Sequence, residues 1–289
     1  PLYSSAASDV YKRQVLPGLI DAHGHIGSLG LFGLGRLDLS TARSMDELVA
    51  KVSAAAKKAG AGAWVLGGRW DHESWPGKEL PRHGGLSAAT SDNPVWLRRV
   101  DGHAGLANAA AMRRAGVTRE TVSPAGGEII RDENGEPTGV FVDNAKGLIE
   151  RVVDAPVPDA AALIDRAQQM CFEVGLTGVH DMGVSPADIE AYRGLAESGR
   201  LKLRVYALLS APYAVAYFED HDLLIGDRLT VRSAKLYADG AMGSRGAWLL
   251  EPYSDRPKGE DGAPYSGLAL TDPARIEACL LYTSPSPRD

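Results

Sequence analysis

The sequence predicts an α/β fold built around a parallel sheet. Two observations indicate this class. Apolar runs typical of buried strands alternate with helical patterns along much of the chain. The first of these runs ends in polar residues, which is where the strands of parallel barrels carry their chemistry.

The first elements follow this alternation. The stretch "VLPGLIDAHGH", residues 15–25, is typical of a buried strand. The stretch "SMDELVAKVSAAAKKAG", residues 44–60, is typical of a helix. Ser44 can cap its first turn, Glu47 stands three residues later as in a capping box, and Gly60 can end it. The order strand then helix is the one expected of an α/β chain.

The next stretch breaks the alternation. Residues 63–70 and 93–100 resemble short apolar strands, and the alanine-rich run 104–116 predicts a helix that ends on Gly116. Residues 127–143 predict a β-hairpin, because two alternating runs flank an Asn-Gly pair, a strong signal for a two-residue turn. We therefore expect an insert at this point of the chain.

Strand and helix patterns alternate again beyond the insert. Residues 159–175 predict a helix that leads into a strand at 176–181, and further strands are expected at 200–209 and 228–240. The number of strands in the alternating part therefore stops near four or five.

Composition restricts the class of protein. The chain has 289 residues, of which 44% are hydrophobic and 24% charged, with a net charge of -6. These values are typical of a soluble globular protein. No Lys/Arg cluster indicates a nucleic-acid partner, and no apolar stretch approaches the roughly 18 residues of a membrane span. The two cysteines fit a reducing compartment, so we expect a cytoplasmic protein.

Two histidines stand at the end of the first predicted strand. His23 and His25 are two residues apart, so they project from the same face of a regular strand, with Asp21 in phase behind them. Two imidazoles placed in this way can share one metal ion. A bare His-x-His is weak evidence, but an apolar strand that ends in Asp-x-His-x-His on an α/β chain favours a ligand pair over two unrelated histidines.

The stretch "LPGLIDAHGHI" resembles the first-strand metal motif of the amidohydrolase superfamily, and five further stretches resemble amidohydrolase family 3 in order and spacing. These are "GGRWDHESWPGKELPR", "NPVWLRRVDGHAGLANAAAMRRAGV", "GGEIIRDENGEPTGVFVDNA", "GLTGVHDMG" and "AKLYADGAMGSRGAWLLEPYSD". The family includes enzymes similar to N-substituted formamide deformylase. The resemblance implies a metal-dependent hydrolase on a (β/α)8 barrel, here a partial, TIM-like barrel with an inserted α+β subdomain and a truncated C-terminal side.

The resemblance divides the chain into five segments. Residues 1–14 and 279–289 look foreign to the rest, as translated adaptor sequence in metagenomic gene calls does, although ordinary disordered termini are the alternative. Residues 15–67 start the barrel with the metal motif, 68–142 form the insert, and 143–278 continue the barrel.

The resemblance also implies roles for individual residues. His23 and His25 would bind a divalent metal. Zinc is the expected metal, and the site would hold one or two ions. Lys235 has no lone pair as an ammonium, but as a carbamate it would bridge two ions; the alternative is an ordinary lysine paired with Asp239 or Asp21. His180 is a further candidate ligand. The alternative is that His180 is a hydrogen-bonded residue of the core or pocket.

Three residues are expected to lie at the substrate pocket. His103 would contact the substrate, unless it is a capping or packing histidine. Trp70 would line an apolar wall, although tryptophan is as often simple packing. Asp239 would shape the rim, with a solvated loop as the alternative.

The implied reaction is hydrolysis of a non-peptide carbon–nitrogen bond in a small-molecule amide or formamide by metal-activated water. Because a catalytic zinc site needs about three protein ligands, and because the superfamily takes its other histidines and its general base from later strands, we expect this chain to be half of an enzyme. The chain alone would then be inactive, and its full-length parent would be the hydrolase. A homo-oligomer is one possible assembly of that parent.

Three rival functions remain open. The stretch "GLGRLD", residues 33–38, raises the idea of a nucleotide-binding oxidoreductase, but it lacks the third glycine of that fingerprint. A non-catalytic barrel-like binding protein would explain the missing residues. A superfamily hydrolase that acts on cyclic amides, phosphoesters or esters would share both fold and motif, because function depends on the rim loops.

Overall fold

The computed structural model describes residues 16–259 and 262–277. The chain forms two compact units, each made of two segments. The first unit comprises Pro1–Gly33 and Asp159–Lys235, and the second comprises Leu34–Pro158 and Leu236–Asp289. The sequence boundaries expected after residues 67 and 142 both lie inside the second unit.

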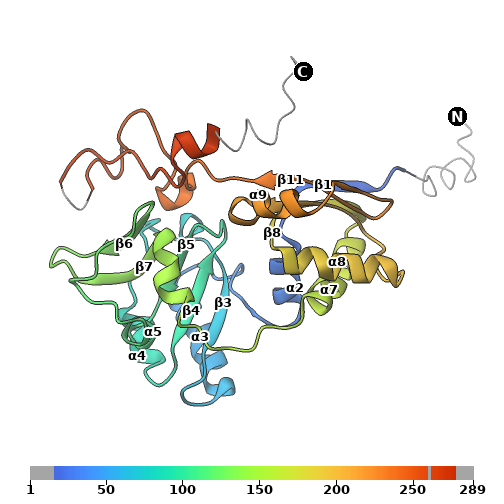
Figure 1. The fold of residues 1–289 in the computed structure, drawn as a ribbon. Helices are drawn as coiled ribbons and strands as arrows, with labels where there is room; N and C mark the ends of the chain where they lie inside the picture. Colours follow the sequence, from blue (N-terminus) through green and yellow to red (C-terminus); the bar gives the residue numbers. More distant parts are fainter. Residues whose placement is uncertain (1–15, 260–261, 278–289) are drawn as a thin grey trace, which may run out of the picture. The chain divides into compact units, whose positions relative to one another are not determined.

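The first unit contains a five-stranded sheet with the order β1-β8-β9-β11-β10. Figure 1 labels its strands β1, β8 and β11. Its strands are β1 (Leu19–Gly24), β8 (Leu176–Val184), β9 (Arg204–Ser210), β11 (Leu229–Lys235) and the short β10 (Leu224–Ile225). The first four are parallel, and β10 pairs antiparallel with β11. Four parallel neighbours confirm the predicted α/β class and are consistent with part of a TIM-like barrel.

The helices of this unit are α2 (Ile26–Gly33), α7 (Ala160–Glu173), α8 (Pro186–Glu197) and α9 (Ala211–Asp220). Every second residue of β9 is buried against them: Val205, Ala207 and Leu209 belong to one apolar core with Ile164 of α7 and Ile189 of α8. The residues between them on β9 are only partly buried. The sheet therefore buries one face under helices and leaves its other face partly exposed, with Tyr206 and Ser210 among its side chains.

The strand β1 corrects one sequence expectation. Its apolar residues predict a buried strand, but the strand is exposed along nearly its whole length, with Leu19 at 62% and Ile20 at 59% exposure. The reason is its position, because β1 lies at the edge of the sheet and pairs only with β8. An exposed apolar edge of this kind favours association with another strand.

The second unit contains a mixed six-stranded sheet with the order β2-β3-β4-β5-β7-β6. Its strands are β2 (Leu37–Asp38), β3 (Val65–Trp70), β4 (Val95–Arg99), β5 (Ala104–Ala107), β7 (Pro137–Asp143) and β6 (Gly127–Arg131). The first three are parallel and the others antiparallel. The predicted hairpin over 127–143 is confirmed as β6 and β7, with Gly135 at φ +81° in the turn.

Helices and short 3-10 turns complete this unit: α3 (Met45–Ala59), α4 (Gly84–Ala89), α5 (Ala109–Ala115), α6 (Gly147–Glu150), η1 (His72–Ser74), η2 (Asn144–Lys146) and η3 (Met242–Ser244). The predicted helix at 44–60 is confirmed as α3. The Glu47 backbone N–H donates to Ser44 Oγ, 3.2 Å away, and Gly60 ends the helix at φ +85°.

The predicted helix at 104–116 is only half right. Residues Ala104–Ala107 form β5, and the helix α5 runs only from Ala109 to Ala115. Gly116, which follows it, adopts the left-handed conformation. Alanine has a high helix propensity, but the pairing of β5 with β4 and β7 overrides it at four fully buried positions. Among all described residues, no helix is long and apolar enough to cross a membrane.

Candidate metal centre

The carboxyl ends of the parallel strands of the first unit meet at one edge of the sheet. His25 directly follows β1, Lys235 is the last residue of β11, and both strands belong to this sheet. Gly24 is in register with Asp181 of β8, and Lys235 is in register with Ser210 at the end of β9. The strand of Lys235 therefore belongs to the same sheet as the histidine motif.

His23 and His25 lie beside each other with their ring centroids 5.6 Å apart and their planes at 77°. A tetrahedral zinc ion bound to two imidazoles at about 2.0–2.1 Å places the ring centroids about 5 Å apart. The observed separation is close to this value, and both side chains are exposed.

A hydrogen bond fixes the tautomer of His25. Its Nδ1 lies 3.0 Å from the backbone oxygen of Met182, which follows Asp181 on β8. A carbonyl oxygen only accepts, so Nδ1 carries the proton and the neutral ring keeps its lone pair on Nε2. Metal-binding histidines in proteins are usually held in this way by a backbone or carboxylate acceptor.

The surroundings of His23 favour its neutral form. Partial desolvation, the Lys235 ammonium and the His25 ring all hold the pKa of His23 below its ordinary value, and Asp21 acts in the opposite direction. Asp21 also accepts a hydrogen bond from the His23 backbone N–H at 2.9 Å through Oδ1. The Lys235 side chain is therefore within electrostatic range of the histidine pair, and a neutral His23 is the form that a metal requires.

His180 stands on β8 at the polar face of the sheet, in register with Tyr206 of β9. Its ring lies 5.0 Å from the Tyr206 ring, centroid to centroid. The Tyr206 hydroxyl contacts Ser233 Oγ and accepts a bond from Arg232 Nε at 3.3 Å. His180 thus lies in a polar cluster on the same unit as the histidine pair, and its role as a ligand stays a prediction.

Within the described ranges, no group of three or more His, Cys, Asp or Glu side chains is close enough to hold a metal ion. His23 and His25 are therefore a pair of donors, and Lys235 is the further predicted ligand of the same unit.

Sequence reasoning missed Asp181, which is buried behind the histidine motif. Its Oδ1 accepts the Ile26 backbone N–H at 2.9 Å, and its Oδ2 accepts the Tyr192 hydroxyl at 2.7 Å. Burial raises the pKa of Asp181 to about 6, although both hydrogen bonds favour the charged form. The sequence did contain a signal for it. Asp181 is in phase with Val179, so an acidic residue stands on the apolar face of a predicted strand, and a buried carboxylate needs hydrogen-bond partners.

The second unit holds a different pair, His103 and Asp143. His103 Nδ1 lies 2.6 Å from Asp143 Oδ1, and the Asp143 backbone N–H donates to the His103 carbonyl at 2.7 Å. Asp143 is almost fully buried and stands at φ +48°, a region that non-glycine residues rarely adopt. Its other oxygen, Oδ2, has no hydrogen-bond partner in the described structure.

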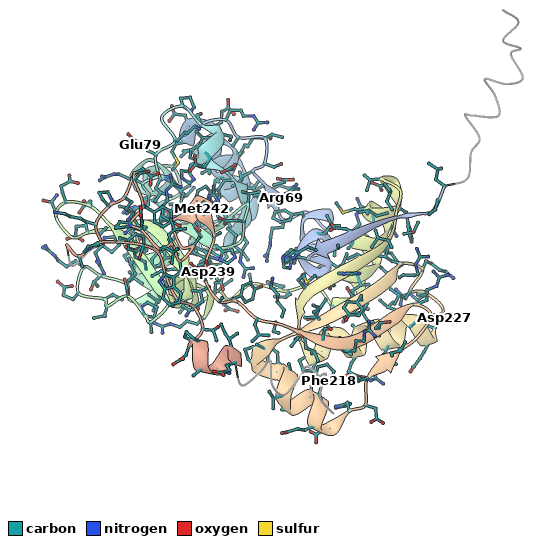
Figure 2. All side chains as sticks on the ribbon, turned by 90° about the horizontal axis from the view of Figure 1, so that it is seen from above. Arg69, Glu79, Phe218, Asp227, Asp239 and Met242 are labelled. Carbon is teal, nitrogen blue, oxygen red and sulfur yellow. The ribbon has the colours of Figure 1, made fainter. Side chains whose placement is uncertain are left out.

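The other two predicted pocket residues also belong to the second unit. Trp70 is fully buried, and its indole N–H donates to the Leu97 carbonyl at 2.8 Å, so it packs in the core of this unit. Asp239, labelled in Figure 2 near Met242, accepts the Trp248 backbone N–H at 2.8 Å through Oδ2. Because β11 ends at Lys235, Asp239 does not share a strand face with Lys235.

Comparison with known proteins gives consistent similarities. A model described as "Amidohydrolase family" matches residues 11–279. The chain is 33% identical over 277 residues to the protein LONG AFTER FAR-RED 3 of Arabidopsis thaliana, covering 91% of this chain and 46% of that protein. It is 30% identical over 244 residues to an N-substituted formamide deformylase of Arthrobacter pascens, covering 81% of this chain and 44% of that protein.

Among solved structures, the fold is similar to an uncharacterized metal-dependent hydrolase from Pyrococcus horikoshii OT3. The TM-score is 0.60 at 25% identity, over 96% of this chain and 55% of that one. The chain thus spans about half the length of the relatives it matches.

Proposed function

We propose that this chain, which belongs to the amidohydrolase family, provides the first-strand metal motif of a hydrolase that cleaves a carbon–nitrogen bond in an N-substituted amide or formamide. One observation carries the proposal: the His23 and His25 rings lie 5.6 Å apart at the carboxyl end of β1, with Nε2 of His25 left to accept a metal. The N-substituted formamide deformylase among its relatives supports this choice of substrate.

His23 and His25 would hold a divalent metal ion, for which we propose zinc, and Lys235 would join them as a carbamate. When bound, such an ion acidifies water and polarises a carbonyl group. The chain's own residues prepare the ligands. The Met182 carbonyl keeps His25 in the Nδ1–H tautomer, and before carboxylation the Lys235 ammonium favours the neutral form of His23. His180 and the Tyr206 hydroxyl would offer hydrogen bonds to a ligand on the same polar face.

In the second unit we propose that His103 contacts substrate. Asp143 Oδ1 accepts its Nδ1–H, so Nε2 is left free of that bond for a hydrogen bond to the substrate. The Tyr237 ring packs edge-on at 6.0 Å and restricts rotation of the imidazole. A buried carboxylate behind a histidine is the arrangement that orients general bases in many enzymes. Asp239 would shape the same unit's ligand-facing loop.

The activity is tested with a panel of N-substituted formamides and amides, by release of the amine, after loading with zinc. Because the described residues provide too few ligands for a catalytic zinc site, we expect turnover in the longer protein encoded by the parent gene and none in this chain. A chelator should abolish the turnover and added zinc restore it. Cleavage of esters but not amides by the longer protein would contradict the proposed substrate class, and chelator-resistant turnover would contradict the metal.

A further inference from the structure

Asp181 connects three elements of the first unit. It lies on β8 with 4% of its surface exposed, and it is in register with Gly24 of β1. One carboxylate oxygen accepts the Ile26 backbone N–H at the start of α2, and the other accepts the hydroxyl of Tyr192 on α8. Since both oxygens are engaged, the orientation of the carboxylate is fixed.

The bond to Ile26 acts directly on His25. The Ile26 nitrogen belongs to the peptide group that carries the His25 carbonyl, and this carbonyl accepts the Leu29 N–H at 3.0 Å to begin α2. The first N–H groups of a helix have no partner within the helix, so Asp181 supplies one from another strand. It thereby fixes the peptide plane that follows the predicted ligand.

The next residue of β8 holds the side chain of the same histidine. Met182 accepts the Nδ1–H of His25 at 3.0 Å, one residue after Asp181. Two consecutive residues of β8 therefore hold His25. Asp181 binds the backbone nitrogen of the next residue, Ile26, and Met182 binds the His25 ring. Asp181 and Met182 are adjacent on β8, so a shift of the strand at Asp181 acts on both bonds to the region of His25.

Packing alone does not fix this arrangement. A cavity of about 190 Å³ is lined by His25, Asp181, Met182 and Tyr192, among others. Packing therefore does not enclose His25 on this side, and the hydrogen bonds contribute to its orientation. Tyr192 is 1% exposed, and its hydroxyl donates to Asp181 Oδ2 at 2.7 Å.

We propose that Asp181 and Tyr192 are positioning residues of the metal motif. Tyr192 orients the Asp181 carboxylate, Asp181 holds the junction between β1 and α2, and His25 is thereby presented with Nδ1 protonated and Nε2 directed to a divalent metal. This inference rests on the metal binding of the proposed function. It adds residues that touch neither the metal nor the substrate.

The test uses the full chain and two readouts. The first is the tautomer of His25 in the metal-free protein, measured by long-range ¹⁵N–¹H NMR after histidine labelling, with His25→Gln to assign the signal. The second is the zinc dissociation constant, measured by competition with a chromophoric chelator. The variants are Tyr192→Phe, which removes only the hydroxyl, Asp181→Ala, and Asp181→Asn, whose amide can still accept from Ile26 and donate to Tyr192.

We expect Tyr192→Phe and Asp181→Ala to weaken zinc binding about 10-fold or more, as loss of a partner outside the ligand set does in other metal sites. Both should also lower the Nδ1–H fraction of His25. Asp181→Asn should stay within about threefold of the wild type, because it keeps the geometry. The matched control is Tyr217→Phe, which removes another buried tyrosine hydroxyl in the same unit, bonded to Arg193, and should change neither readout.

A folded Tyr192→Phe protein with the wild-type tautomer and the wild-type zinc affinity would overturn the proposal, as would an equal loss in Tyr217→Phe. If Asp181→Ala does not fold, Tyr192→Phe and Asp181→Asn decide the question. Failure of the wild type to bind zinc would instead contradict the metal function. The tautomer of His25 in the metal-free variants would still show whether Asp181 and Tyr192 position this ring.

Discussion

Replacing Asn108 by alanine is expected to destabilise the second unit by about 3 kcal/mol, because one fully buried side chain satisfies five backbone and hydroxyl groups. Its Oδ1 accepts the N–H groups of Val95 at 3.0 Å and Ala111 at 2.9 Å, so it pairs with β4 and caps α5. Its Nδ2 donates to the Thr90 carbonyl and hydroxyl and to the Asn93 carbonyl. Alanine would leave the Val95 and Ala111 N–H groups without this acceptor, whereas Thr90 keeps its bonds to Leu86 and Asn93.

The measurement is urea unfolding followed by tryptophan fluorescence. All five tryptophans of the chain lie in the second unit, so their emission reports on this unit alone. The control is Asn144→Ala, which removes one exposed hydrogen bond to the Ala125 carbonyl and should cost less than about 1 kcal/mol. A loss below about 1 kcal/mol for Asn108→Ala would show that water replaces the amide and that the site is less closed than described.

Replacing both His23 and His25 by alanine is expected to weaken zinc binding at least about 100-fold, because the site loses both of its predicted imidazole ligands. Fold stability should change little, since both side chains are exposed at the end of an edge strand. Zinc affinity by chelator competition and the circular dichroism spectrum measure the two effects. If the folded double variant bound zinc with the affinity of the wild type, the metal would have to bind elsewhere in the protein.

The matched control for this pair is His221→Ala. His221 belongs to the same unit but follows α9, where its ring stacks on Tyr217 at 4.2 Å and its Nδ1 meets the Tyr217 carbonyl. Its loss should leave zinc binding unchanged. If the control and the double variant lost equal zinc affinity, zinc would be binding non-specifically to histidines of this protein.

The elements that the sequence predicts correctly are those determined by local chemistry. Ser44 and Gly60 bound α3 through contacts within a few residues, and the Asn-Gly pair determines the hairpin of β6 and β7. The position of β1 at a sheet edge depends on which strands pair with it, and no local pattern reports that. For the same reason the alanine-rich Ala104–Ala107 is a strand.

The candidate site divides in the same way. The spacing of His23 and His25 in one strand is enough to predict that their rings lie together, which the structure bears out at 5.6 Å. The partners that hold them come from far along the chain: Met182 is 157 residues from His25, and Asp181 is 155 residues from Ile26. Contacts over such separations follow from the sheet order and not from any motif. Asp143, 40 residues from His103, escaped prediction for the same reason.

The most direct test of the central claim is X-ray absorption at the zinc edge of the zinc-loaded chain. Binding by His23 and His25 predicts the multiple-scattering pattern of two imidazoles, with Zn–N distances of about 2.0–2.1 Å. That pattern should disappear in the double alanine variant and persist in His221→Ala. A zinc spectrum without imidazole scattering, or one that is identical in the wild type and the double variant, would contradict the assignment of this motif as a metal centre.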